Sequence, residues 1–284
     1  MTHILTLPVS AGLGLKPEHY QDALNCDEPG LWFEVHPENY MVAGGPRLAW
    51  LSGFAEKFPL SFHGVGLSLG GPERPDIAHL GRLKSLVERF NPVQVSEHLA
   101  WSRFENTYFA DLLPPPATEA SLARIVAHIE ETQEFLGRRI LIENPSLYLP
   151  IPGFEDLPEL YVEAAKQSGA GLLFDLNNIN VCAANVDLPE AAWLDAVPGD
   201  LVGEIHLAGA VERTIEDETI LIDSHDAPVA KSVWNLLEKF VKRHGPKPVL
   251  IERDDNLPSF TELLAERNQA QSIVSAATPE LTNA

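Results

Sequence analysis

The sequence predicts an α/β protein, a single (β/α)8 TIM barrel, and three observations support this class. Eight short apolar runs recur along the 284 residues, and segments with helical spacing separate most of them. Strands that alternate with helices predict a parallel sheet, and eight is the number of strands that closes a barrel. An open doubly wound sheet would usually show a G-x-G-x-x-G turn after a strand, and the chain contains none.

Each predicted strand is an apolar run bounded by polar, glycine or proline residues. In chain order the runs cover residues 4–9, 31–35, 59–65, 93–99, 139–144, 171–176, 201–207 and 248–253. Helices are expected at 46–58, 75–90, 119–136 and 228–244, where apolar residues recur at helical spacing or proline and glycine mark the ends. The glycine-rich stretches 12–15 and 63–71 are expected to be loops with positive φ near strand ends. We expect one domain over 1–284, with a flexible tail over about the last ten residues.

Composition excludes several classes of protein. The net charge of −21, from 20 basic and 41 acidic side chains, repels phosphate backbones, so we expect no nucleic-acid partner. No apolar run approaches the ~18 residues that a membrane span needs, and the N-terminus lacks the features of a secretion signal. Cys26 and Cys182 lie too far apart for a zinc motif or a disulfide framework. We therefore expect a cytoplasmic protein with reduced thiols and no membrane contact.

Polar side chains with metal-binding chemistry end six consecutive predicted strands. In a barrel all strand C-termini open onto one mouth, where active sites lie. The side chains would therefore converge although they are spread over 190 positions. The set is four histidines, four carboxylates and one amide: His63, His98, Glu143, Asp175, Asn178, His206, Asp223, His225 and Glu252.

The stretch LIDSHDAPV, residues 221–229, adds a carboxylate and an imidazole two positions apart. In an extended segment residues i and i+2 point the same way, so Asp223 and His225 can face one ion. Nitrogen and oxygen ligands without cysteine suit zinc, iron or manganese. The set is too large for one tetrahedral ion and fits two or three ions that share a bridging carboxylate. Burying four carboxylates together without a cation would be very costly, which favours a metal site.

The other six histidines are expected not to be ligands: His3, His19, His36, His79, His128 and His244. His36 is the nearest to an exception, because it also follows a predicted strand. For Glu38 and Asn39, which lie beside it, the sequence leaves three roles open: lining the pocket, orienting a ligand, or a purely structural role.

The order of these motifs resembles a known family, the multinuclear non-heme iron-dependent oxidases, long described as domain of unknown function 692. The resemblance runs from GLGLKPEHY near the start to LIERDDNLPSFTELLAE near the end. Between them WFEVHPENYM, SFHGVGLSLG, VSEHLAWS, LIENPSLYL, LLFDLNNINV, GEIHLAGA, LIDSHDAPV and VLIERDDNLPSF follow in the family's order. The family, which includes oxidases of methanobactin biosynthesis, belongs to the xylose isomerase-like barrel superfamily, which also holds the trinuclear zinc enzyme endonuclease IV.

The resemblance implies a residue-by-residue assignment. His63 and His98 would hold a first iron, and Glu143 would bridge it to a second. Asp175, His206 and Glu252 would complete the second site, and these six residues would carry catalysis. A third ion would be held by Asn178, Asp223 and His225.

The implied activity is the oxidation of cysteines in a ribosomally made precursor peptide, with two to three irons and dioxygen. The products would be oxazolone-thioamide or thiooxazole groups. A cysteine thiolate is a soft ligand for an open iron position, and iron can pass electrons to dioxygen, which zinc cannot. A separate partner protein would capture the precursor's leader.

Three other functions stay open from the residues alone. A zinc-dependent hydrolase or endonuclease on the same barrel would activate water, although the acidic charge disfavours DNA. A sugar isomerase would use two divalent ions, and no lysine stands at a strand end for it. A protein that handles copper or iron without catalysis would need the ligands alone.

Overall fold

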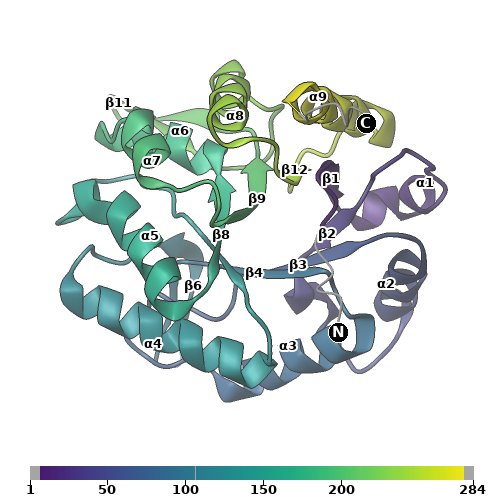
Figure 1. The fold of residues 1–284 in the computed structure, drawn as a ribbon, viewed down its shortest axis with the longest axis horizontal. Coiled ribbons are helices and arrows are strands. Elements are labelled where there is room, and N and C mark those ends of the chain that lie inside the picture. Colours follow the sequence, from purple (N-terminus) through teal and green to yellow (C-terminus); the bar gives the residue numbers. More distant parts are fainter. Residues whose placement is uncertain (1–6, 106, 278–284) are drawn as a thin grey trace, which may run out of the picture.

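The eight barrel strands form one closed parallel sheet in the computed structural model, which describes residues 7–105 and 107–277. Around the barrel the strand order is β1-β12-β9-β8-β7-β4-β3-β2, and Figure 1 shows helices forming the outer ring. The strands are β1 (Ala11–Gly14), β2 (Phe33–Val35), β3 (Leu60–Gly64), β4 (Gln94–His98), β7 (Leu141–Glu143), β8 (Gly171–Asp175), β9 (Val202–Leu207) and β12 (Val249–Ile251). The predicted fold class is confirmed.

The helices alternate with these strands as an α/β barrel requires. They are α1 (Tyr20–Leu24), α2 (Pro46–Lys57), α3 (Ile77–Phe90), α4 (Glu119–Leu136), α5 (Leu157–Ser168), α6 (Leu176–Val186), α7 (Glu190–Ala196), α8 (Lys231–His244) and α9 (Phe260–Ala277). Short 3-10 turns precede three of them at Pro17–His19, Pro37–Tyr40 and Phe154–Asp156. The flexible tail expected at the C-terminus falls mainly on residues 278–284, outside the described part of the chain.

The four predicted helices form close to their expected bounds. α4 has the predicted limits, because Thr118 caps its first turn through Ser121 N and Gly137 ends it in the left-handed conformation. α3 begins two residues later than expected, where the Asp76 side chain accepts a hydrogen bond from Ala78 N. α8 begins three residues late, at Lys231.

The first strand differs from its prediction. It covers Ala11–Gly14, so the expectation of a loop at 12–15 was wrong. Of the predicted run 4–9, residues 7–9 form no strand, and residues 4–6 lie outside the described part of the chain. A side chain at Gly12 would put its Cβ 2.3 Å from the Trp32 ring, so glycine lets β1 pack directly on the indole. In the stretch 63–71 the glycines also lack positive φ, and Ser68 adopts it instead, with φ of 55°.

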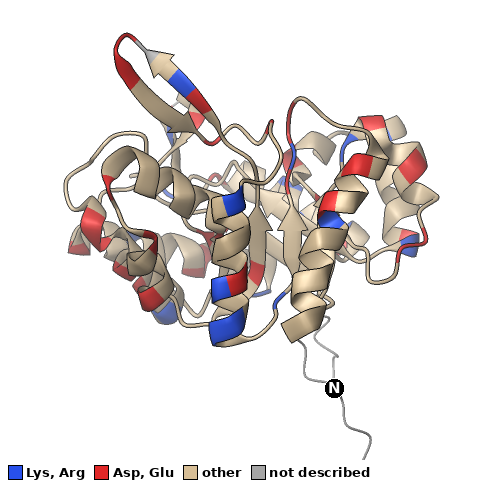
Figure 2. Ribbon diagram, turned by 90° about the horizontal axis from the view of Figure 1, so that it is seen from above, with Lys and Arg blue, Asp and Glu red and all other residues tan. Residues whose placement is uncertain are grey.

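The two ends of the barrel have different chemistry. At the end where strands begin, the buried side chains of Leu7, Trp32 and Leu250 pack together. Two antiparallel hairpins, absent from the predicted elements, follow β4 and β9: β5 (Trp101–Phe104) with β6 (Thr107–Leu113), and β10 (Val211–Ile215) with β11 (Glu218–Ile222). In Figure 2 the β10–β11 hairpin stands clear of the barrel at the end opposite the N-terminus.

Among the helices of the described residues, none has both the length and the apolar character that a membrane span requires.

Candidate metal centre

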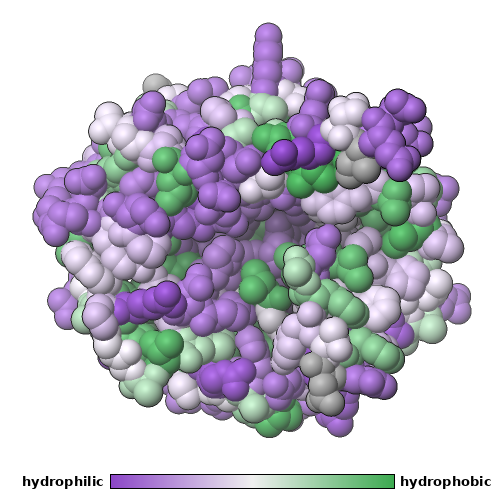
Figure 3. Space-filling view, turned by 180° about the vertical axis from the view of Figure 1, so that it is seen from behind, coloured by the Kyte–Doolittle hydropathy of each residue, from purple (hydrophilic) through white to green (hydrophobic). Residues whose placement is uncertain are grey.

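The predicted polar side chains meet at the C-terminal mouth of the barrel. Figure 3 views this face and shows a central hollow lined mainly by hydrophilic residues. A cavity of about 270 Å³ opens there, and its walls include His98, Asn178, Asp223, His225 and Glu252. Parallel strands place their C-terminal residues at one end, which explains the convergence of residues so far apart in the chain.

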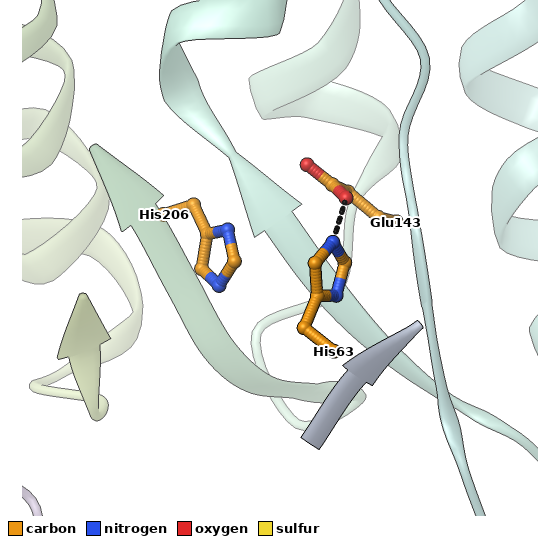
Figure 4. A group of neighbouring side chains, drawn as sticks. All are labelled: His63, Glu143 and His206. Atoms are coloured by element: carbon orange, nitrogen blue, oxygen red, sulfur yellow. Dashed lines mark ion pairs between the residues drawn. The ribbon is translucent and has the colours of Figure 1, made fainter. Parts of the chain in front are cut away.

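His63, His98 and Glu143 form one tight group. The Nε2 atoms of His63 and His98 lie 2.9 Å apart. Glu143 Oε2 lies 3.0 Å from His63 Nε2 and 2.8 Å from His98 Nδ1. On the other side of the His63 ring, Nδ1 lies 2.8 Å from Ser96 Oγ, which fixes the ring orientation. Figure 4 shows the His63–Glu143 ion pair with His206 facing it across the barrel.

Asp175 and Asn178 connect this group to helix α6. Asp175 ends β8 and caps α6, because its Oδ1 accepts a hydrogen bond of 2.6 Å from Asn178 N. Asn178 Nδ2 donates to Asn144 O at 2.9 Å and to Glu143 Oε1 at 3.3 Å. Among the described residues, Asp175 Oδ2 and Asn178 Oδ1 have no hydrogen-bond donor although both are buried. Each therefore offers a free oxygen to a cation.

Glu252 joins the remaining ligand candidates. Its Oε2 lies 3.3 Å from His206 Nδ1 and 3.5 Å from His225 Nδ1. The opposite ring nitrogen of His225, Nε2, lies 2.8 Å from Asp223 Oδ1. The predicted pair thus meets, and Asp223 also accepts a 2.6 Å hydrogen bond from Asn177.

Asp223 and His225 do not meet through the extended segment that the sequence predicted. His225 is not extended, since its φ is 51°, in the left-handed region. The loop is held by a hydrogen bond from His225 N to Gly209 O. A side chain at Gly209 would put its Cβ 2.0 Å from Ala227 O, so the close loop contact needs glycine there.

Two buried carboxylates that the sequence analysis missed lie beneath His206. Glu34 Oε1 is 3.2 Å and Glu204 Oε1 3.5 Å from His206 Nε2. Ser61 Oγ lies within hydrogen-bonding distance of both, 2.9 Å from Glu34 Oε2 and 3.2 Å from Glu204 Oε2. The signal was present: Glu204 precedes His206 by two positions in one strand, so both side chains face the same side. Glu34 interrupts the apolar run 31–35 in the same way.

His36 also lies closer to the centre than predicted. Its Nε2 is 3.8 Å from Glu252 Oε1 and 4.0 Å from Asp254 Oδ1. Asp254 in turn accepts a hydrogen bond from Lys16 Nζ. His36, Glu252 and Asp254 thus form a group that could hold a metal ion at the exposed side of the mouth, and the prediction that His36 is not a ligand stays untested.

Electrostatics shows how much negative charge the mouth concentrates. Burial, followed by the charge of Glu143, raises the pKa of Asp175 well above its usual range. Burial also works against ionised Glu143, but the charges of His98 and His63 hold its pKa below the ordinary value. Burial disfavours protonated His206, yet Glu34 and its other carboxylate neighbours raise its pKa well above normal. Protonated imidazoles here supply positive charge that a bound cation would otherwise supply.

In the part of the chain that the structure describes, four groups of three side chains can each place one ligand atom within 4.8 Å of the others. They are His63 with Glu143 and His206, Glu34 with Glu204 and His206, His36 with Glu252 and Asp254, and Asp175 with His225 and Glu252. His206 and Glu252 each belong to two groups. Shared ligands of this kind suit a centre with more than one ion.

Solved structures with the same fold have low sequence identity to this chain. IolI protein with a bound zinc atom has a TM-score of 0.61 at 12% identity and covers 95% of this chain and 99% of its own. A xylose isomerase-like TIM barrel protein from Mycobacterium smegmatis, in complex with magnesium, has a TM-score of 0.58 at 13% identity and covers 98% and 99%. These similarities show that the chain has the same TIM-barrel fold as xylose isomerase-like proteins.

Sequence relatives are much closer. A UPF0276 protein of Caulobacter vibrioides is 52% identical over 94% of this chain and 95% of its own. A UPF0276 protein of Bordetella bronchiseptica is 45% identical over 93% of this chain and 92% of its own. The family model described as "RiPP precursor modification enzyme MbnB/TglH/ChrH" matches residues 10–275, nearly the whole described barrel. The chain therefore belongs to the MbnB/TglH/ChrH family of enzymes that modify ribosomally made peptide precursors.

Proposed function

We propose that this chain is an iron- and dioxygen-dependent oxidase that modifies cysteine residues of a ribosomally made precursor peptide. The observation that supports it best is the convergence of imidazole and carboxylate groups at the mouth of a barrel whose family modifies such precursors. Thiooxazole or oxazolone-thioamide groups are the proposed products.

The residues fit a centre of two to three irons. Asp175 Oδ2 and Asn178 Oδ1 are buried oxygens without a donor among the described residues, as expected of atoms that bind a cation. The proposed ligands are His63 and His98 for one ion, Asp175, His206 and Glu252 for a second, and Asn178, Asp223 and His225 for a third. Glu143 lies between the first two groups and is proposed to bridge them. Nitrogen and oxygen donors of this kind suit iron, zinc and manganese alike.

The chain itself contributes position and exclusion of water. Ser96 holds the His63 ring, and Asn178 holds the Glu143 carboxylate. The 270 Å³ cavity above them admits a small side chain, and its wall at Leu99, Ala100 and Leu112 is apolar. Bound iron would supply electron transfer to dioxygen, with the peptide cysteine as the group that is oxidised.

The first experiment measures metal content and oxygen consumption. The protein is purified without oxygen from iron-replete cells and analysed for iron, zinc and manganese. Two to three irons per chain, and dioxygen uptake on addition of a cysteine-containing precursor peptide encoded in the same genome, are the expected results. Stoichiometric zinc with no oxygen uptake in the iron-reconstituted protein would overturn the oxidase proposal and favour hydrolysis.

A separate leader-binding protein is the remaining part of the proposal. Size-exclusion chromatography of the labelled precursor with this chain alone, and with the product of a neighbouring gene, tests it. Tight binding of the full leader by this chain alone would contradict the need for a partner.

A further inference from the structure

A second hollow, of about 660 Å³, adjoins the metal-binding cavity. Val65 and residues 110–112 line both spaces. Its volume is within the range of about 300–1,000 Å³ that is typical of ligand pockets. It lies away from the ligand candidates themselves, so the metal centre does not account for it.

The strand β6 forms one wall of this hollow and has a free edge. Within the described residues, β6 pairs with β5 alone. Its Tyr108 side chain is 59% exposed, and Phe104 on β5 is 45% exposed. An unpaired strand edge presents backbone N–H and C=O groups that form a ready template for an added strand, and the exposed Tyr108 ring offers an apolar contact beside it. The edge is therefore suited to an extended peptide.

Arg82 is an available positive charge on the other wall. Its side chain is exposed and makes no ion pair with any carboxylate of the described residues, and its Nη2 lies 3.5 Å from His79 Nδ1. The carboxylate of the nearby Glu38 pairs with other groups and not with Arg82. Its Oε1 lies 3.2 Å from His79 Nε2 and accepts a hydrogen bond from Val65 N. A guanidinium without a carboxylate partner fits a peptide carboxylate, with which it can form paired hydrogen bonds.

We propose that an extended segment of the precursor peptide adds as a strand to the free edge of β6. Its side chains occupy the 660 Å³ hollow, with an acidic residue at Arg82, and the neighbouring cysteine enters the cavity at His98. This inference rests on the proposed peptide substrate and identifies where the residues next to the cysteine bind. The hollow and the metal cavity together then define both the reacting residue and its sequence context.

The test uses fluorescence anisotropy with the metal-loaded protein under anaerobic conditions. The probe is a cysteine-containing precursor peptide encoded in the same genome, labelled at its N-terminus. Arg82→Glu is expected to raise Kd by about tenfold or more, because it removes a hydrogen bond to a charged group and adds repulsion. Arg213→Glu, on the exposed strand β10, is the matched control and should leave Kd within about twofold.

N-methylation of successive peptide amides tests the strand pairing directly. An added strand directs every second N–H at its neighbour, so binding should weaken at alternate positions. Wild-type binding with no alternation, or equal effects of Arg82→Glu and Arg213→Glu, would overturn the inference and leave the oxidase intact. A metal-loaded wild type that neither binds the probe nor takes up dioxygen with it, alone or with the leader-binding protein, would overturn the proposed peptide substrate, and the inference with it.

Discussion

His206 is held between carboxylates on both sides of its ring. Glu252 lies 3.3 Å from Nδ1, and Glu34 lies 3.2 Å from Nε2. A histidine that binds a metal through one nitrogen commonly donates its other N–H to a carboxylate, which fixes the ring and raises its basicity. Glu34 therefore orients His206 so that Nδ1 faces the proposed cation.

Replacing this buried carboxylate should weaken metal binding without unfolding the barrel. For Glu34→Gln we expect the affinity for Co²⁺, followed by visible absorption, to fall by about 10–100-fold. The amide keeps the size of the side chain but loses the charge that polarises His206. Glu163→Gln, on the surface of α5, is the matched control. Unchanged Co²⁺ affinity in Glu34→Gln, with native circular dichroism, would contradict this role.

The proposed ligands themselves should be indispensable for turnover. His63→Ala, His98→Ala and Asp175→Ala are each expected to lower peptide-dependent oxygen uptake by more than about 100-fold. This loss exceeds the roughly 10–100-fold that is typical when a residue that only hydrogen-bonds a metal ligand is replaced. Iron content should fall in the same variants while thermal unfolding stays cooperative. Asp195→Ala, at an exposed ion pair with Arg243, controls for loss of surface charge. Full activity in any of the three variants would refute its assignment.

The strand β1 illustrates how a single contact sets the position of an element. The Gly12 backbone lies against the ring of Trp32, and a Cβ would approach Trp32 Cδ2 and Cε2 to 2.3 and 2.4 Å. Such distances force the indole or the strand to move. The same contact helps close the end of the barrel where the strands begin, beneath Glu34 of the neighbouring β2.

Gly12→Ala should therefore destabilise the protein by about 1–3 kcal/mol in urea unfolding, as overpacked cores do. Gly81→Ala on α3 is the control, because nothing lies within 4 Å of its Cβ position. There alanine should stabilise the exposed helix by up to about 1 kcal/mol. Equal effects of the two substitutions on the free energy of unfolding would show that the contact with Trp32 does not cause the loss of stability.

The groups at the mouth of the barrel couple the stability of the whole molecule to pH and to metal binding. Half-buried His36 has its pKa raised to about 9, because Asp254 and Glu252 outweigh the cost of burial. Burial and the charge of Glu34 raise the pKa of Glu204 to about 8. In this range the folded, metal-free chain binds more protons than the unfolded chain. Its stability must then fall as pH rises from about 6.5 to about 9.

Chelated protein should accordingly show a lower thermal midpoint at about pH 9 than at about pH 6.5. Added Zn²⁺ should raise the midpoint more at the higher pH, where fewer protons compete with the ion. His36→Gln should flatten part of the decline. A metal-free midpoint that rises with pH would contradict the proposed role of protons, and no response to any divalent ion would contradict the metal centre.

Much of this architecture could be predicted because its signals are local. Seven of the eight barrel strands lie within their predicted apolar runs, since a strand buried on both faces reads as a short apolar segment. α4 ends where its cap and Gly137 indicate. The strand-end residues from His63 to Glu252 lie at one mouth, because strand direction in a closed parallel barrel leaves no other place for them.

The predictions from the sequence were wrong or incomplete where the local structure depends on contacts between distant segments. The start of β1 depends on Trp32, which lies in a separate segment from Gly12. The two hairpins consist largely of exposed residues, so no apolar run marked them. Glu34 and Glu204 were not singled out within their predicted strands, since their shared contact with His206 exists only after the barrel closes.

The sequence by itself determined the eight-stranded barrel and the chemistry of its mouth, because apolar runs and the polar residues that end them are properties of short segments. Tertiary structure alone decided which ligand groups share His206 and Glu252, which carboxylates lie beneath them, and how β6 forms a second hollow beside the cavity. Those features depend on distances across the barrel, which follow from closure of the sheet and from packing between residues far apart in the chain.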